Sequence, residues 1–109
     1  MKAITLQTRG GPESLALGDA PEPSPRAGEV LVRVRASGVT PTELTWVPTW
    51  TTREGTPRQF PVIPGHEFSG EVAALGTGVK DFAVGDLVYG MSDWFAEGTQ
   101  AEYCVAPAE

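Results

Sequence analysis

Cysteine and histidine are nearly missing from this 109-residue sequence, which holds one of each. The single Cys104 excludes an intramolecular disulfide and a structural zinc site of four thiolates. A chain without disulfides suits a reducing compartment, and we expect a cytoplasmic location. Cys104 stands in residues 101–105, which alternate as a strand does, so we expect a buried and unreactive thiol there.

Long apolar runs and clusters of basic residues are also absent. The apolar runs are a few residues long, far below the roughly 20 that a membrane-spanning helix needs. Residues 1–10 lack the apolar core of a signal peptide. Eight Lys and Arg residues stand against 14 Asp and Glu residues, and the basic ones form no stripe. We therefore expect neither a membrane nor a nucleic acid among the partners.

Glycine and proline, by contrast, are abundant, with 13 and 10 residues. Both residue types favour turns and interrupt helices, which predicts many short strands. The clearest is 29–36, where three valines alternate with Leu31, Arg33 and Arg35. The sequence predicts one all-β domain over residues 1–109, a small barrel. Its expected strands are 2–8, one around residues 15–17, 29–36, 68–75, 87–89 and one around residue 103.

One short helix is expected after the strand that ends near Gly38. Thr40 has the character of an N-cap, Pro41 fits the first helical position, and Glu43 follows the cap by three residues. This helix is expected to end before Pro48, and residues 47–61, which show no usable period, are expected to form a loop.

Polar side chains gather at turns beside predicted strand ends, where folds usually place functional groups. The three segments are 38–43, 64–72 and 85–90. Together with their neighbours they read EVLVRVRASGVTPTEL, PGHEFSGEVAALGTGVKDFAVGDLVYG and AEYCVAPAE. In this order and spacing they resemble the GroES-like domain of the medium-chain dehydrogenase/reductase superfamily, which includes zinc alcohol dehydrogenases and zinc-free quinone reductases. The resemblance implies a GroES-like, partly open barrel with one or two short helical turns.

The resemblance also implies a second domain, because in that superfamily a Rossmann domain that binds NAD(P)H follows the barrel. No G-x-G-x-x-G stands after a predicted strand here, and Gly76-Thr77-Gly78 is expected to be a turn between strands. We therefore expect residues 1–109 to be the catalytic-half domain alone, with the Rossmann cofactor domain absent from this chain. On this interpretation the isolated chain is inactive.

Four residues stand at the site positions of the zinc alcohol dehydrogenases. Carried over one by one, the resemblance puts Thr40 at a cysteine ligand, Thr42 at a hydroxyl relay, and His66 and Glu67 at the G-H-E motif. A neutral hydroxyl is a poor zinc ligand, and His66 with Glu67 gives at most two ligands where a catalytic zinc usually has three. We expect no zinc; if a metal binds, His66 and Glu67 hold it.

The resemblance thus favours zinc-independent, NADPH-dependent reduction of an activated C=C or C=O bond, of quinone or enone type. Thr40, Thr42, His66 and Glu67 are the implied catalytic residues, and Thr40, Pro41 and Thr42 the implied cofactor contacts. The substrate is expected to be an apolar carbonyl or quinone, and the parent protein a homo-oligomer.

Aromatic residues after the presumed active turn suggest an apolar substrate pocket, for which Trp46 and Trp50 are the main candidates. Trp46, Trp50, Phe60, Trp94 and Phe95 fit core or interface packing equally well.

Simpler roles compete at three of the site positions. His66 can satisfy backbone carbonyls, Glu67 can pair with Arg33 or Arg35, and Thr40 can serve only as a helix cap.

Two other functions remain open. One is a zinc-dependent alcohol dehydrogenase whose metal is held by His66, Glu67 and a later ligand. The other is a stand-alone GroES-like module for binding or oligomerisation, without catalysis. Residues 47–60 are the candidate mobile loop of such a module.

Overall fold

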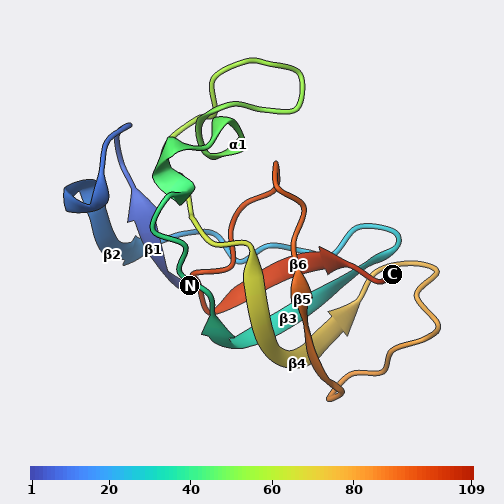
Figure 1. Ribbon diagram of the computed structural model, residues 1–109. Coiled ribbons are helices and arrows are strands. Elements are labelled where there is room, and N and C mark those ends of the chain that lie inside the picture. Colours follow the sequence, from blue (N-terminus) through green and yellow to red (C-terminus); the bar gives the residue numbers. More distant parts are fainter.

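Six strands form two antiparallel sheets in the computed structural model, which describes residues 1–109 (Figure 1). The small sheet pairs β1 (Lys2–Leu6) with β2 (Leu15–Asp19). The large sheet has the order β5-β4-β3-β6, with β5 at Leu87–Met91, β4 at Glu67–Leu75, β3 at Glu29–Ser37 and β6 at Tyr103–Pro107. The predicted all-β class is confirmed, and the two sheets do not close into a barrel.

The main core lies on one face of the large sheet and follows from the alternation of β3. Val30 and Val32 are buried, and Val32 lies opposite Val72 on β4 and Cys104 on β6. Phe68 and Ala106 complete this core. Burial raises the pKa of the Cys104 thiol to about 12, so the thiol is packed as an apolar group, in line with the sequence prediction.

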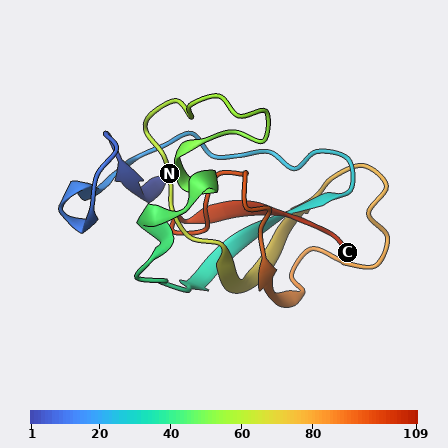
Figure 2. The same ribbon diagram turned by 45° about the horizontal axis from the view of Figure 1, so that its top comes forward.

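A second core fixes the β1–β2 hairpin to the middle of the chain. Leu6, Trp50 and Val62 pack together, and Leu6 and Val62 exchange backbone hydrogen bonds of 2.8 and 2.9 Å. In both views the segment around Trp50 and the loop after it lie toward the β1–β2 hairpin, with the C-terminus at the opposite end of the large sheet (Figures 1 and 2). This core therefore sets where residues 43–62 stand relative to the sheet.

The helical segments differ from the prediction in position. Residues 41–42 form a turn, a 3₁₀ segment η2 follows at Glu43–Thr45, and the α-helix α1 covers Val47–Trp50; a further 3₁₀ turn, η1, lies at Pro12–Ser14. The expected cap by Thr40 and the expected end before Pro48 are both wrong. Pro48 lies in the first turn of α1, where a missing N–H costs nothing. No helix is long and apolar enough to cross a bilayer.

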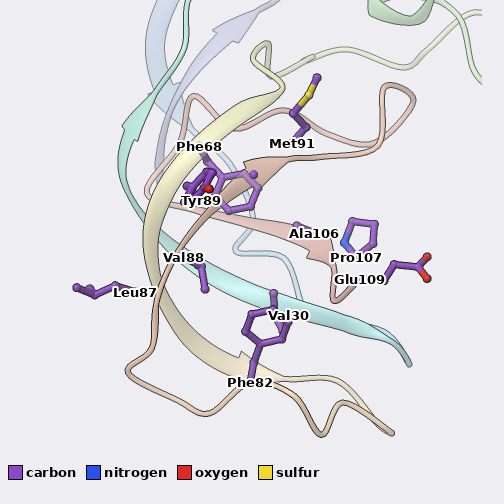
Figure 3. A pocket seen from close by; sticks show the side chains of 11 residues that line it. Val30, Phe68, Phe82, Leu87, Val88, Tyr89, Met91, Ala106, Pro107 and Glu109 are labelled. Carbon is purple, nitrogen blue, oxygen red and sulfur yellow. The ribbon is translucent and has the colours of Figure 1, made fainter.

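β5 presents an apolar row on the edge of the large sheet, because it pairs only with β4. Leu87 and Tyr89 are 85% and 88% exposed, and Met91 is also exposed. Residues of β5, Val88 among them, also line an apolar hollow of about 280 Å³ together with Val30 and Phe82 (Figure 3). An edge strand with exposed apolar side chains is a template for pairing with another chain.

This edge predicts concentration-dependent self-association of the 109-residue chain. Leu87→Lys and Tyr89→Lys are expected to weaken it, because a charge on an edge strand opposes pairing. Val47→Lys, at an equally apolar position that is 68% exposed on α1, serves as the control. Light scattering over a concentration series measures the mass. A wild-type chain that stays monomeric throughout contradicts the prediction.

Gly70 marks the closest approach of β4 to β3. A Cβ built there would lie 2.1 Å from the backbone oxygen of Arg33, which a rigid strand cannot avoid. Gly90 on the neighbouring β5 faces only the ring of Phe68, at an ordinary contact distance of 3.5 Å. Of these two positions, only the one in the β3–β4 pair therefore requires glycine.

Gly70→Ala is expected to lower the free energy of unfolding by about 1–3 kcal/mol, the usual cost of overpacking. Gly90→Ala is the matched control and should change stability much less. Urea unfolding followed by tryptophan fluorescence measures both. Equal stabilities for the two variants would show that β3 and β4 do not meet as closely as described.

Candidate active site

A buried carboxylate from η2 organises the polar residues between η2 and β4. Glu43 is 4% exposed, and its Oε2 atom accepts a hydrogen bond of 2.6 Å from the backbone N–H of Gly65. The same oxygen lies 3.7 Å from Nε2 of His66. Thr49 stabilises η2 by donating a hydrogen bond from its hydroxyl to the Glu43 carbonyl at 2.6 Å. Glu43 therefore reaches across to the segment before β4 instead of capping a helix start.

His66 packs against two indole rings. Its ring centroid is 6.1 Å from that of Trp46, in a stacked arrangement, and 4.9 Å from that of Trp94. The two indoles contact each other edge to face at 5.0 Å. His66 itself is 5% exposed. The imidazole is thus enclosed by an aromatic wall drawn from two loops far apart in the sequence.

Two buried polar atoms in this region have no hydrogen-bond partner, Nδ1 of His66 and Oγ of Ser92. The two residues are neighbours, since the backbone N–H of Ser92 donates to the His66 carbonyl at 2.8 Å. Buried polar atoms are nearly always paired, and exceptions concentrate at functional sites. Both atoms are enclosed, and their hydrogen-bonding capacity is unused within the chain.

The pKa of His66 is lowered from its ordinary value of 6.5, mainly because burial disfavours the charged imidazolium. The nearby Glu43 carboxylate raises this pKa, and Arg58 lowers it. His66 is therefore neutral at pH 7, with one ring nitrogen as donor and the other as acceptor. Because the unfolded chain takes up this proton at higher pH than the folded chain, stability decreases as the pH falls below about 6.5.

Glu67, the other half of the predicted pair, does not join His66. It begins β4, is exposed, and lies against the backbone of Gly38. Successive strand residues point to opposite faces, which separates the two side chains. The expected pairing of Glu67 with Arg33 or Arg35 is also absent; those arginines face Glu71 at 3.8 and 2.7 Å.

The segment 40–42 lies on the rim beside Glu43. Thr40 and Pro41 line a hollow of about 120 Å³ together with Glu43 and Pro64. The Thr40 carbonyl accepts the backbone N–H of Glu43 at 3.1 Å. Thr42 is exposed at the turn, and its carbonyl accepts the hydroxyl of Thr45. The hydroxyl of Thr42 has no partner within the chain and faces outward at the rim.

Trp46 contacts His66, whereas Trp50 does not. Trp50 is 6% exposed in the second core, and its indole N–H donates to the Leu44 carbonyl at 2.8 Å. Its position favours packing over substrate contact. The residues missed by the sequence analysis are Glu43, Ser92 and the site role of Trp94. Trp94 carried a signal as part of the aromatic set, and Glu43 carried one as part of the polar segment 38–43, where it was assigned to a helix start; Ser92 carried none.

The residues at the metal-ligand positions do not fit a zinc ion. Thr40 offers a neutral hydroxyl, Glu67 points away from His66, and the nearest carboxylate to His66 is Glu43, which already accepts the Gly65 N–H. No group of three or more His, Cys, Asp or Glu side chains in the chain could hold a metal ion. No chemical step is assigned to a metal here.

The chain also lacks a site for a dinucleotide pyrophosphate. Gly76 and Gly78 form the turn after β4, as predicted, and no helix follows them. The α-helix, at four residues, is too short to bind an anion at its N-terminus.

Glu43→Gln is expected to lower the pKa of His66 further, because it removes the charge that favours the imidazolium. The amide oxygen can still accept the Gly65 N–H, so the turn should persist. NMR titration is direct, since His66 is the only histidine. Glu67→Gln, which removes a weaker influence on the same pKa, is the control and should shift it less. An unchanged or higher His66 pKa in Glu43→Gln contradicts the geometry.

Known proteins are similar to this chain over almost its whole length. The family model described as the alcohol dehydrogenase GroES-like domain matches residues 26–109. A chloroplastic quinone oxidoreductase, QR1, from Triphysaria versicolor is 40% identical over 98 residues, which is 89% of this chain and 29% of that protein.

Solved structures are similar to this chain over nearly its whole length. The quinone oxidoreductase from Coxiella burnetii matches 98% of this chain and 34% of its own with a TM-score of 0.84 and 30% identity. A mycobacterial structure complexed with NADPH matches 99% of this chain and 30% of its own with a TM-score of 0.77 and 38% identity. The chain thus spans about a third or less of these relatives. It belongs to the alcohol dehydrogenase GroES-like domain family of the medium-chain dehydrogenase/reductase superfamily.

Proposed function

We propose that residues 1–109 form the catalytic half of a zinc-independent, NADPH-dependent oxidoreductase that reduces an activated C=C or C=O bond. The observation that carries the proposal is the donor set around His66. A hydroxyl stands where a zinc site needs a thiolate, and Glu67 lies on the far side of β4. Relatives named quinone oxidoreductases support the substrate class, an apolar quinone or enone.

The cofactor is held mainly by a domain outside residues 1–109, in this proposal. When bound, the reduced nicotinamide supplies the hydride. Thr40, Pro41 and Thr42 would contact its nicotinamide end, since Thr40 and Pro41 line the hollow beside Glu43 and Thr42 is exposed at the adjoining turn. The isolated chain is inactive in this proposal because it lacks the domain that holds most of the cofactor. The NADPH complex of the mycobacterial relative supports the choice of cofactor.

The substrate oxygen gains negative charge as the bond is reduced, and fixed hydrogen-bond donors stabilise that charge. Thr42 is the proposed donor or proton relay, because its hydroxyl is exposed at the rim. Neutral His66 is the second proposed polar contact; its Nδ1 atom is buried and has no partner within the chain. Glu43 keeps the imidazole in place without reaching the substrate itself.

Trp46 forms one wall of the proposed apolar pocket, and Trp94 takes the place that the sequence analysis gave to Trp50. Both indoles contact His66, so a planar ring bound against them would lie near its free nitrogen. Flat aromatic walls suit flat substrates such as quinones.

A cytoplasmic location and a homo-oligomeric parent protein remain part of the proposal. The buried thiol of Cys104, with no disulfide, supports a reducing compartment. The apolar edge of β5 supports contact with further protein.

Thr42→Val in the full-length oxidoreductase is expected to lower kcat about 10²–10³-fold, the usual effect of losing one oxyanion donor. Thr42→Ser retains the hydroxyl and should keep most of the activity. Stopped-flow oxidation of NADPH with a quinone measures both variants. Wild-type turnover in Thr42→Val removes Thr42 from the mechanism.

A further inference from the structure

Two loops that are distant in the sequence meet beside the aromatic wall. Arg53 directs one guanidinium nitrogen, Nη2, at both carboxylate oxygens of Asp93, at 2.7 and 2.5 Å. The same guanidinium lies 4.8 Å above the ring of Phe95. Arg53 thus contacts the residue before Trp94 and the residue after it.

The loop that carries Asp93 and the loop that carries Arg53 are each fixed by internal hydrogen bonds. Oδ1 of Asp93 accepts the backbone N–H of Phe95 at 2.8 Å, which makes residues 93–95 a tight turn. On the other side, Thr52 and Thr56 close the turn around Arg53 through backbone and hydroxyl hydrogen bonds of 2.7 Å. Exposed ion pairs usually contribute little because ordering two long side chains costs entropy. Here the turns have already reduced that cost.

A second arginine anchors the same two loops. Arg58, whose side chain is 9% exposed, pairs with Glu97 and donates to the carbonyls of Pro48 and Ala96 at 3.4 and 3.5 Å. The nearly buried contacts of Arg58 hold the two loops together at residues 58 and 96–97. Arg53 joins the same loops at their tips, residues 53 and 93–95. Removing Arg53 should therefore loosen the tip without detaching the loop.

Trp94 needs such a support because burial alone does not hold it. It is 42% exposed, yet its ring lies 4.9 Å from the fully enclosed His66 and 5.0 Å from Trp46. The backbone of Trp94 is fixed by its neighbours, and both neighbours contact Arg53. The wall of the site therefore depends on a residue that does not touch it.

We propose that Arg53 is a positioning residue: its guanidinium, held between the Asp93 carboxylate and the Phe95 ring, keeps Trp94 against His66 and closes the aromatic wall. Its importance for substrate binding rests on the proposed function, whereas the positioning itself can be tested on this chain alone.

NMR of the imbedded imidazole provides the test, because His66 is the only histidine and the ring currents of Trp46 and Trp94 shift its carbon-bound protons. Spectra at pH 8, where His66 is neutral, report ring positions and not protonation. Trp94→Leu supplies the reference without this indole. Arg53→Gln is expected to move the His66 signals at least halfway toward that reference.

Two further variants separate charge from turn structure. Asp93→Asn keeps an oxygen for the Phe95 N–H but loses the charge, and should move the signals in the same direction. Lys2→Gln breaks an equally exposed ion pair with Asp19, at 2.8 Å on the β1–β2 hairpin, and should leave them unchanged. If the His66 signals of Arg53→Gln superimpose on those of the wild type, with the amide spectrum showing a folded chain, the proposal is overturned.

Kinetics of the full-length oxidoreductase distinguish the two proposals. Arg53→Gln should raise KM for an apolar quinone about threefold to tenfold, the value of one aromatic contact, with kcat little changed. Shifted His66 signals with an unchanged KM support the positioning role and contradict the substrate wall. Unshifted signals refute the positioning role whatever the kinetics.

Discussion

The site depends on the carboxylate of Glu43, which is buried and yet placed by η2 next to the segment that leads into β4. Its hydrogen bond from the Gly65 N–H joins the segment after β3 to the start of β4, and its charge faces His66. A carboxylate in such a place is costly unless it is hydrogen-bonded, so this contact strongly determines how residues 43–66 are arranged. The hollow at Thr40 adjoins this carboxylate, and His66 beside it contacts Trp46 and Trp94.

Burial and charge act on His66 in opposite directions, and burial has the larger effect. The imidazole is therefore a neutral hydrogen-bonding group with a free nitrogen, enclosed by Trp46 and Trp94. A neutral donor or acceptor next to flat apolar surfaces suits recognition of a carbonyl on a planar substrate. Chemistry that requires a metal would need donors that this chain directs elsewhere, since Glu67 faces Gly38.

Strand positions were predictable because side chains alternate between the two faces of β3 and β6, so that Val30, Val32 and Cys104 can be assigned to one face from the sequence. Leu31, on the other face of β3, is buried as well. The positions of the helical segments were not predictable from the sequence. The spacing from Thr40 to Glu43 fits both a capping box and a carboxylate that accepts a hydrogen bond from a distant backbone amide. Only tertiary contact with Gly65 decides between them. Trp94 was equally ambiguous, since its contact with His66 links loops that are 28 positions apart.

Metal dependence of the full-length oxidoreductase tests the central claim most directly. The protein is purified in the presence of a strong chelator, its zinc content is measured, and NADPH-dependent reduction of a quinone is assayed before and after zinc is added. Zinc-independent reduction predicts activity without stoichiometric zinc and no gain on its addition. Activity that is lost with the chelator and restored by zinc would contradict it, and would assign His66 to a metal site completed by residues outside this chain.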